Sequence, residues 1–466
     1  MNLAEHVLRA GQAVPDHQAL VVMGADDAQV WTHGDLRRAV LGTAMGLTRA
    51  GLRPGDRLLM RLANRPAFPI AYLGAIAAGV IPVPTSAQLT GAEITRIAAR
   101  IAPAMIVAGA GVPLPDHPAP VLTEGDLDGI ATLPPADFAQ GSADRLAYIV
   151  FTSGSSGQPR AVMHAHRAIL ARQAMMQGWY GLRAEDRLLH AGAFNWTFTL
   201  GTGLLDPWTL GATALIPADG TPIERIPLLA ARHGATILAG APGVFRRMLR
   251  APFPDLPHLR HGLSAGEKLA EPLRDAWERA TGTALHEAYG MSECSTFVSG
   301  SPARPAPEGA AGYVQPGRSA WVEGDRLMVG PDDPGLMLGY WEDGAPRPVA
   351  GPFDTGDRVR PLPDGAIVHE GRRDDLLNPG GHRVSPQEVE AALAGLPVTE
   401  LAVGCVETAS GATILAAFYA GPPLDEAAAD AHAAARLAAY KRPRAWLRRD
   451  ALPRNANGKL IRRDLA

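Results

Sequence analysis

Cysteine is scarce in this chain, with only Cys294 and Cys405 among 466 residues. The two are too far apart in sequence to match the close spacing of disulfide frameworks or zinc sites. A fold that depends on disulfides or on a cysteine-bound metal is therefore excluded, and a reducing compartment is the environment that fits.

The chain also lacks an excess of charge of one sign. It has 44 basic and 47 acidic residues, a formal net charge of −3. Neither sign forms a long run, whereas nucleic-acid-binding domains present a concentrated basic face. Nucleic acid is therefore not expected as the main partner, and small molecules are the expected ligands.

No apolar run is long enough to span a bilayer, because the longest weakly polar segment, 72–84, is interrupted by glycine and proline. The first ten residues contain Glu5 and His6. A signal peptide has a basic start and an unbroken apolar stretch instead. These features predict a cytoplasmic protein without a membrane span.

The chain is longer than one ordinary domain, and with 47% hydrophobic residues it can bury a large core. Strand-like runs alternate with helical runs: 57–62 and 80–83 are strand-like and enclose a helical segment at 66–78. This alternation predicts an α/β fold of mainly parallel sheets flanked by helices. Ligand sites in such folds lie at the carboxyl ends of strands.

A Ser/Gly-rich loop follows the apolar run 146–151, which reads as a buried strand. The loop consists of Thr152, Ser153, Gly154, Ser155, Ser156 and Gly157, and Arg160 comes shortly after it. Small residues let backbone N–H groups face phosphate oxygens, and Arg160 adds positive charge. A flexible linker is the alternative, although linkers seldom lie between two core strands. The loop lacks the Gly-Lys-Ser/Thr step of the commonest phosphate loop.

Three short motifs are expected at strand ends. S-A-G-E at 264–267 follows the strand-like segment L-R-H-G-L, Y-G-M-S-E at 289–293 follows A-L-H-E-A, and T-G-D occupies 355–357. In the second motif an aromatic ring can stack on a purine, Ser292 can reach a phosphate and Glu293 can bind Mg²⁺. Ordinary turns are the alternative interpretation of all three motifs.

An aromatic cluster lies between these motifs, in a chain with only 6% aromatic residues. Its members are Phe194, Trp196 and Phe198. Together with Met291 they predict a pocket for an apolar carboxylic acid. Core packing is the alternative.

The sequence changes character after Gly371. Ser385 and Glu388 form a capping-box pattern with proline at the first helical position, which predicts a helix to about residue 393. Strands are expected at 401–406 and 413–419, and an Ala-rich helix at 425–439. These elements predict a small α+β domain.

Taken together, the motifs resemble those of the adenylate-forming enzymes: acyl-CoA synthetases, carrier-protein adenylation domains and luciferases. T-S-G-S-S-G-Q-P-R-A resembles T-S-G-T-T-G-x-P-K-G, with Arg160 in place of Lys and Ala161 in place of Gly. Y-G-M-S-E resembles Y-G-x-T-E, and 453–459 resembles P-x-x-x-x-G-K. The resemblance extends over nearly the whole chain, although 302–350 is shorter than usual. The aromatic stretch is most similar to that of medium-chain and benzoate-type acyl-CoA ligases.

The resemblance implies roles for individual residues. Asp357 would accept hydrogen bonds from the ribose hydroxyls, Arg372 would bind ribose or phosphate, and Lys459 would contact the carboxylate and ATP. Lys459, Glu293 and Ser292 are the expected catalytic residues, and Glu293 the metal ligand. The nucleotide would also contact Thr152 to Gly157, Arg160, Gly266, Glu267, Tyr289 and Gly290.

The resemblance also implies a domain organisation. An N-terminal adenylation domain would occupy 1–373, a hinge would lie at Asp374, and a mobile C-terminal domain would occupy 375–466. Gly380, Gly381 and Arg383 would line the path of CoA. Without the resemblance, the charged run at 372–375 would be a solvated linker and Lys459 a terminal cation.

The implied activity is that of an AMP-forming acid–CoA ligase. It would use ATP and Mg²⁺ to convert a small apolar acid, aromatic or short to medium chain, into acyl-AMP and then into acyl-CoA. Transfer to a carrier protein is one alternative, but the cations at 440–444 suit the phosphates of CoA. A non-catalytic nucleotide-binding protein is the other, which the joint retention of Glu293, Asp357 and Lys459 disfavours. Both a monomer and a homodimer stay open.

Overall fold

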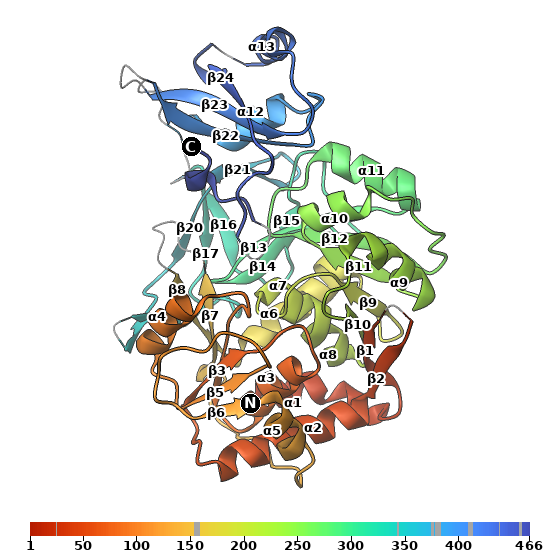
Figure 1. Cartoon of the computed structure of the whole chain (residues 1–466), viewed down its shortest axis with the longest axis vertical. Helices are drawn as coiled ribbons and strands as arrows, with labels where there is room; N and C mark the ends of the chain where they lie inside the picture. Colours follow the sequence, from red (N-terminus) through yellow and green to blue (C-terminus); the bar gives the residue numbers. More distant parts are fainter. Residues whose placement is uncertain are drawn as a thin grey trace. The chain divides into compact units, whose positions relative to one another are not determined.

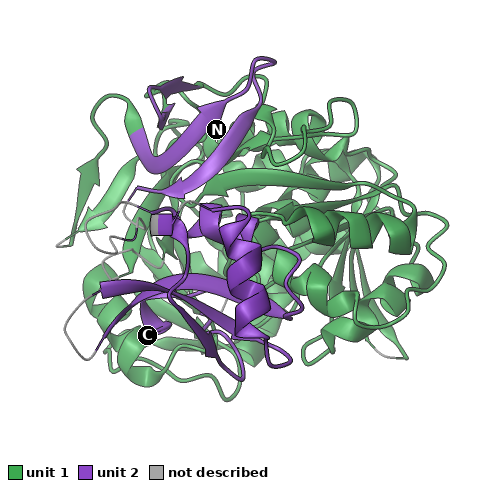
Figure 2. Ribbon diagram, turned by 90° about the horizontal axis from the view of Figure 1, so that it is seen from above, with its two compact units in different colours: residues 1–320, 329–353 green, residues 321–328, 354–466 purple. Residues whose placement is uncertain are grey.

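The computed structural model describes residues 1–24, 26–152, 159–342, 344–373, 377, 384–408, 413–437, 439–455 and 459–466. They form two compact units, which Figure 2 shows in different colours. Unit 1 contains residues 1–320 and 329–353, and unit 2 contains 321–328 and 354–466. Because Asp374 lies outside the described residues, the domain boundaries expected from the sequence stay a prediction. None of the helices in these ranges has the length and apolar character that crossing a membrane requires.

Unit 1 contains a nine-stranded sheet in the order β15-β14-β13-β12-β11-β9-β10-β1-β2 (Figure 1). The six strands from β13 to β1 are mutually parallel, and antiparallel strands extend both edges. The bounds are β1 Gln18–Met23, β2 Ala28–Thr32, β9 Arg187–His190, β10 Thr213–Pro217, β11 Ile237–Gly240, β12 His261–Ala265, β13 Leu285–Met291, β14 Ser295–Ser299 and β15 Tyr313–Val314. The parallel strands β1, β9, β10 and β11 are mainly apolar on both faces, as burial between helices requires, whereas β12 and β13 also carry buried polar residues.

Helices cover both faces of this sheet. On one face, Phe245 and Trp277 from the covering helices pack against strand residues such as Leu189. On the other face, Trp179 and Phe198 pack against Leu188 and its neighbours. The first group comprises α9 Ile226–Arg232, α10 Pro242–Met248 and α11 Glu271–Thr281, and the second includes α6 Ala168–Met175, η2 Met176–Tyr180 and α7 Thr197–Leu200. Each helix of the first group has proline in its first turn, where no backbone N–H is needed.

A second, fully parallel sheet has the order β4-β3-β5-β6. It confirms the strand–helix–strand unit predicted between residues 57 and 83, since β3 and β4 pair in parallel across α3. Its elements and the helices near the N-terminus are α1 Leu3–Leu8, η1 Ala10–Ala13, α2 His33–Arg49, β3 Arg57–Arg61, α3 Ala67–Ala77, β4 Ile81–Pro84, α4 Gly91–Ile101, β5 Met105–Ala108, β6 Val121–Thr123 and α5 Glu124–Ala131. Every residue of α3 is buried, because the helix is apolar on all sides.

A third sheet, in the order β19-β18-β8-β7, is antiparallel throughout. Its strands are β7 Leu146–Thr152, β8 Arg160–Ala165, β18 Gly339–Glu342 and β19 Ala345–Pro348. The Ser/Gly-rich segment therefore joins two antiparallel strands of the core. The segment 302–350, which is shorter than expected for the resembled family, contains the five strands β15 to β19, and β18 pairs with the start of β8.

Unit 1 also contains η3 Gly201–Leu205, α8 Asp206–Leu210 and η4 Ile223–Arg225. Unit 2 is built mainly from two sheets, β16-β17-β20-β21 and β22-β23-β24. Its elements are β16 Ala320–Glu323, β17 Arg326–Val329, β20 Phe353–Pro361, β21 Ile367–Arg372, α12 Pro386–Ala392, β22 Glu400–Glu407, β23 Thr413–Ala420, α13 Glu426–Ala434, η6 Ala439–Lys441, β24 Ala445–Arg448 and η7 Arg462–Asp464.

Two expectations for this unit were wrong. The Ala-rich helix ends at Ala434, not near 439, because Leu437 turns into the core and Arg442 donates to the carbonyl of Ala434. Alanine favours helix on every face, so the sequence pattern contains no end signal. The T-G-D motif lies inside β20 and not at a strand end. Gly356, with φ of +77°, provides the local irregularity that looked like a turn.

The buried histidines predict acid sensitivity. Burial lowers the pKa of five of them to about 3 or 4: His164, His166, His190, His261 and His286. An unfolded histidine titrates near 6.5, so below that pH the unfolded state binds more protons than the folded state. Each histidine then reduces the free energy of unfolding by up to about 1.4 kcal/mol per pH unit, down to its folded pKa. We expect the melting temperature to fall steeply between pH 6.5 and 4, and equal values at pH 7 and pH 5 would contradict this.

Candidate functional site

The S-A-G-E motif lies where β12 ends, as predicted. Gly266 makes the turn with φ of +96°, a conformation that favours glycine. A Cβ atom on Gly266 would come within 2.5 Å of the Trp196 ring. Glu267 lies 3.8 Å from an arginine of α10, Arg246. The structure therefore brings one predicted nucleotide motif against the aromatic cluster.

The Y-G-M-S-E motif occupies the end of β13 and the turn into β14. Gly290 permits a close approach of the two strands, since a Cβ there would lie 2.4 Å from the carbonyl oxygen of Ser295. The pairing of β13 with β14 shifts register at this point. The Tyr289 ring packs edge-on against Phe297, at 5.4 Å between centroids. Backbone proximity and ring packing thus orient this motif.

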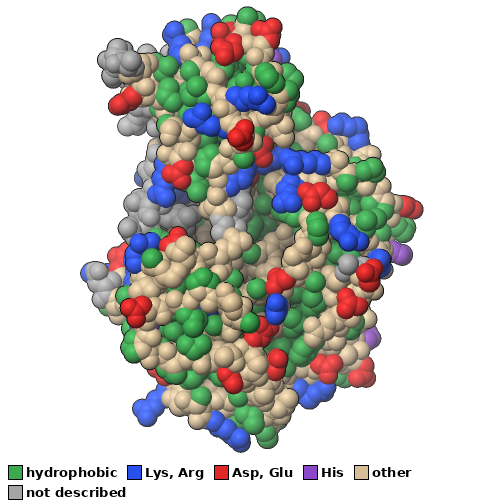
Figure 3. Space-filling model, viewed as in Figure 1, with side chains coloured by type: hydrophobic (Ala, Val, Ile, Leu, Met, Phe, Trp, Pro, Cys, Tyr) green, Lys and Arg blue, Asp and Glu red, His purple; other side chains and the backbone are tan. Residues whose placement is uncertain are grey.

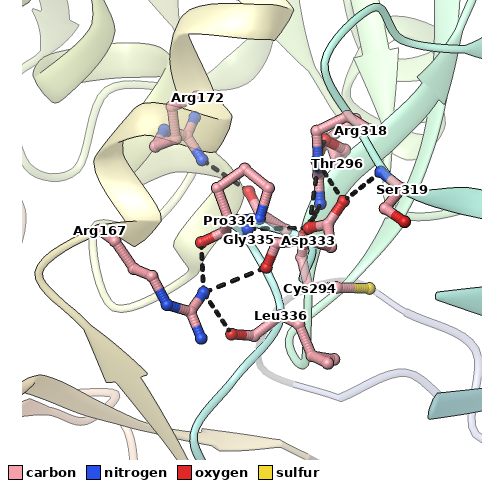
Figure 4. Close-up of polar contacts among 11 residues, drawn as sticks. Arg167, Arg172, Cys294, Thr296, Arg318, Ser319, Asp333, Pro334, Gly335 and Leu336 are labelled. Carbon is pink, nitrogen blue, oxygen red and sulfur yellow. Dashed lines mark hydrogen bonds and ion pairs between the residues drawn. The ribbon is translucent and has the colours of Figure 1, made fainter. Parts of the chain in front are cut away.

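A buried arginine holds the chain that follows Glu293 (Figure 4). Arg318 donates to the carbonyl oxygens of Cys294 and Thr296, both at 2.7 Å. Its ion pair with Asp333 is also 2.7 Å long, and both side chains are fully buried. Asp333 in turn accepts hydrogen bonds from the backbone of Ser319 and Gly335. The loop 333–335 is thereby tied to the motif.

A second arginine, Arg172 of α6, holds the same turn from another side. It donates to the Ser295 hydroxyl at 2.9 Å and forms a buried pair with Asp206 at 2.7 Å. Tyr180 also donates to Asp206, at 2.8 Å. Ser295 has φ of +60°, rare for a residue with a side chain, and the bond from Arg172 stabilises it.

Glu293 is 9% exposed and is held through both its backbone and its side chain. Its carbonyl oxygen accepts from the backbone N–H of Met337 at 2.7 Å, and Oε1 accepts from the Tyr340 hydroxyl at 3.0 Å. Burial and the neighbouring carboxylate raise the pKa of Tyr340, so its hydroxyl keeps the proton that it donates. Glu293 Oε2 makes no hydrogen bond to any described residue.

The neighbouring Ser292 is held through its carbonyl oxygen, which lies 2.7 Å from Nε2 of His164. Burial lowers the pKa of His164 to about 4, so the ring is neutral at pH 7. Because a carbonyl only accepts, the Nε2 atom must hold the proton and donate it.

Arg160 lies over the same tyrosine. Its guanidinium is 3.4 Å from the centroid of the Tyr340 ring, and Nη2 is 3.8 Å from Glu342. Thr152 pairs with Arg160 across β7 and β8. It is the last residue of β7, directly before the Ser/Gly-rich segment. Tyr340 thus contacts both the predicted phosphate-binding cation and the predicted metal ligand.

Glu293 fits a role in binding Mg²⁺ together with a nucleotide. Within the described ranges there is no group of three or more His, Cys, Asp or Glu that could hold a metal ion. Mg²⁺ is commonly bound by one or two carboxylates and completes its octahedral shell with substrate phosphates and water. A single buried carboxylate with one oxygen that bonds to no described residue is suited to that arrangement.

The four residues predicted to form the acid pocket do not pack as one group. Trp196 and Phe198 pack edge to face at 5.1 Å and share a cluster with Trp179. Phe194 instead packs on Phe68 at 5.6 Å, in the cluster of the N-terminal helices. Met291 is half-buried on β13. The role of each of them in binding substrate stays a prediction.

In unit 2 the structure brings Asp357 and Arg372 together on β20 and β21. Their Cα atoms are register partners, and the guanidinium lies 3.6 Å from Asp357 Oδ2. His369 contacts the other carboxylate oxygen at 3.0 Å. Lys459 is exposed, and Asn455 accepts from its backbone N–H at 2.9 Å.

Several predicted residues lie outside the described part of the chain, and their roles stay predictions: Ser153, Gly154, Ser155, Ser156, Gly157, Asp374, Gly380, Gly381 and Arg383. Conversely, the sequence analysis missed Tyr340, Arg172 and Arg318. Nothing in their neighbouring residues distinguishes them from ordinary core or surface positions. Their importance follows from partners far away in the chain.

Figure 3 shows one face of the molecule with its side chains coloured by type. Basic and acidic side chains are interspersed there over unit 1.

Comparisons with known proteins agree on one family. A family model described as AMP-binding enzyme matches residues 7–341. The chain is 30% identical to the 3-hydroxybenzoate–CoA/4-hydroxybenzoate–CoA ligase of Thauera aromatica, over 92% of this chain and 90% of that protein. It is 32% identical to the p-hydroxybenzoic acid–AMP ligase FadD22 of Mycobacterium tuberculosis, over 93% of this chain and 65% of that protein. A benzoate CoA ligase structure from Burkholderia xenovorans LB400 has the same fold, with a TM-score of 0.89 at 24% identity over 100% of this chain and 99% of that one.

Proposed function

Because the chain belongs to the family of AMP-binding enzymes, we propose that it is an AMP-forming aromatic acid–CoA ligase. The observation that supports this most directly is the contact of Trp196 with Gly266. It joins an aromatic surface, suited to a benzene ring, to a motif suited to a nucleotide. The similarity to hydroxybenzoate–CoA and benzoate–CoA ligases over nearly the whole chain supports the same class of substrate.

The first half-reaction brings two anions together. A carboxylate oxygen forms a bond to the α-phosphorus of ATP, the bond from that phosphorus to the bridging oxygen breaks, and pyrophosphate leaves with the electron pair. Arg160 would neutralise phosphate charge, and Lys459 would lie between carboxylate and ATP. Mg²⁺ bound at Glu293 would supply further neutralisation of the phosphates.

The second half-reaction forms the thioester. The sulfur of CoA attacks the acyl carbonyl carbon, its proton is lost to solvent or a base, and the bond to AMP breaks. The mixed anhydride is vulnerable to water, so a change of conformation that admits the thiol protects it. Asp374 is the proposed hinge, and Gly380, Gly381 and Arg383 are the proposed lining of the CoA path.

In a second candidate function the enzyme forms acyl-AMP in the same way, but the acyl group is then transferred to a carrier protein instead of CoA. It is favoured by the similarity to the acid–AMP ligase, although the chain spans only 65% of that relative.

Pyrophosphate release over a panel of acids tests both candidates. The panel contains benzoate, 3- and 4-hydroxybenzoate, hexanoate, acetate and succinate, each with and without CoA. We expect release with aromatic acids and thioester formation when CoA is present. Release without any thioester would support the carrier-protein candidate, preference for succinate would contradict an apolar pocket, and no release with any acid would contradict an adenylating enzyme.

Tyr340→Phe should raise the Mg²⁺ concentration required for half-maximal adenylation by about tenfold. The variant keeps the ring under Arg160 but removes the hydroxyl that holds Glu293, and loss of such a supporting hydrogen bond typically costs ten- to a hundredfold in metal affinity. Tyr313→Phe is the matched control, because Tyr313 also lies beneath an arginine, Arg304, at 3.3 Å. An unchanged Mg²⁺ requirement in Tyr340→Phe would show that its hydroxyl does not position the metal ligand.

A further inference from the structure

Two buried polar side chains beside the aromatic cluster lack hydrogen-bond partners. His190 ends β9, is fully buried, and neither of its ring nitrogens bonds to a described residue. Thr199 of α7 is likewise fully buried, and its hydroxyl has no partner within the described ranges. Since more than about 90% of buried polar groups are paired, two neighbouring exceptions indicate a ligand group that would pair with them.

The two side chains lie near each other beside Gly192. A Cβ atom built there would lie 2.2 Å from the Thr199 hydroxyl oxygen and 3.2 Å from His190 Nδ1. The carbonyl of Gly192 is fixed by a hydrogen bond from the Asn64 side chain at 2.7 Å. Because both polar atoms lie this near one position, they are close enough to each other for a single ligand atom to bond to both. That atom must lie beside them and not at the Cβ position itself, where the Thr199 oxygen leaves no room.

This point adjoins the rings proposed to bind the aromatic acid. The His190 ring meets Phe198 edge to face, at 4.5 Å between centroids, and Phe198 meets Trp196 at 5.1 Å. Ala239, the register partner of His190, belongs with Ala265 and Ala288 to the same cluster. These are the smallest side chains of the cluster, so the strands add little bulk beside the aromatic rings.

The charge of His190 restricts what it can bind. Burial, together with the nearby Arg172 guanidinium, lowers the pKa of His190 to about 3. The neutral imidazole has one donor and one acceptor nitrogen, and a threonine hydroxyl both donates and accepts. A second carboxylate would meet no positive charge on His190, whereas a hydroxyl group could donate to one of the two side chains and accept from the other.

We propose that His190 and Thr199 recognise a hydroxyl group on the ring of the aromatic acid, so that the preferred substrates are hydroxybenzoate-type acids. This inference rests on the proposed function and specifies its substrate class. A site that pairs with a hydroxyl discriminates against the analogue without it, because buried groups are then left unpaired.

The test compares kcat/KM for acid-dependent pyrophosphate release with benzoate, 3-hydroxybenzoate and 4-hydroxybenzoate. We expect the protein to prefer one hydroxybenzoate over benzoate by about a hundredfold or more. His190→Leu and Thr199→Val should each reduce this preference by about tenfold. A merely structural role would lower kcat/KM for both acids equally and leave their ratio unchanged.

His261→Leu provides the matched control. His261 is also buried with an unpaired Nε2, but it begins β12 and therefore lies at the opposite end of the strands. Its substitution should not alter the preference for a hydroxybenzoate. Thr199→Val changes shape so little that its folding is expected even if His190→Leu fails to fold.

The outcomes separate the two proposals. No pyrophosphate release with any aromatic acid would contradict the proposed function. Release with benzoate at a kcat/KM equal to that for both hydroxybenzoates would overturn only the inference about His190 and Thr199. A preference that persists unchanged in Thr199→Val and His190→Leu would overturn it as well.

Discussion

Lys459→Ala should lower the rate of acyl-AMP formation by about a hundredfold to a thousandfold. One preorganised cation placed where charge develops in the transition state typically stabilises it by about 3 to 4 kcal/mol. The substitution should leave the loop in place, because Asn455 is bonded to the backbone of residue 459 and not to its side chain. Acid-dependent pyrophosphate release in a single turnover measures the effect.

Synthetic acyl-AMP supplied with CoA isolates the second half-reaction. We expect thioester formation from it to be nearly unaffected in Lys459→Ala, since the lysine is proposed to act only during adenylation. Equal damage to both half-reactions would mean that Lys459 has a structural role. Arg463→Ala is the control for charge, because it removes another exposed cation from the same segment. Among the described residues, Arg463 pairs with Asp464 alone.

Arg318→Met should destabilise unit 1 by about 3 to 5 kcal/mol, the usual cost of leaving one partner of a buried ion pair uncompensated. Asp333 would lose its counter-charge at a position with no solvent exposure. The carbonyl groups of Cys294 and Thr296 would lose their donor as well. Denaturant unfolding, followed by the fluorescence of the tryptophans, measures the loss.

Two further variants identify the cause. Arg38→Met removes an arginine from an exposed pair with Asp35, and we expect a change below about 1 kcal/mol. The double variant Arg318→Met, Asp333→Leu removes both charges and should recover part of the stability, because no unpaired charge is then buried. If Arg318→Met is as stable as Arg38→Met, the buried pair does not hold the turn after Glu293.

Local sequence determined most of the regular elements. Strands such as β3 and β4 follow from short, mainly apolar runs, and the turn at Gly266 follows from a glycine at a strand end. A strand of a parallel sheet that is buried on both faces needs a nearly continuous run of apolar residues. Such a run can be recognised in the sequence without knowing which strands pair with it. The class of fold and the order of the motifs could therefore be predicted from the sequence.

Only the tertiary structure decided which distant side chains meet. Tyr340 reaches Glu293 because β18 pairs with β8, a pairing between segments nearly 180 residues apart. Arg172 and Arg318 meet Asp206 and Asp333 inside the core, and His190 meets Thr199 beside Gly192. Periodicity and composition describe one segment at a time, whereas these contacts depend on how whole sheets and helices pack, and so the supports of the site became visible only in three dimensions.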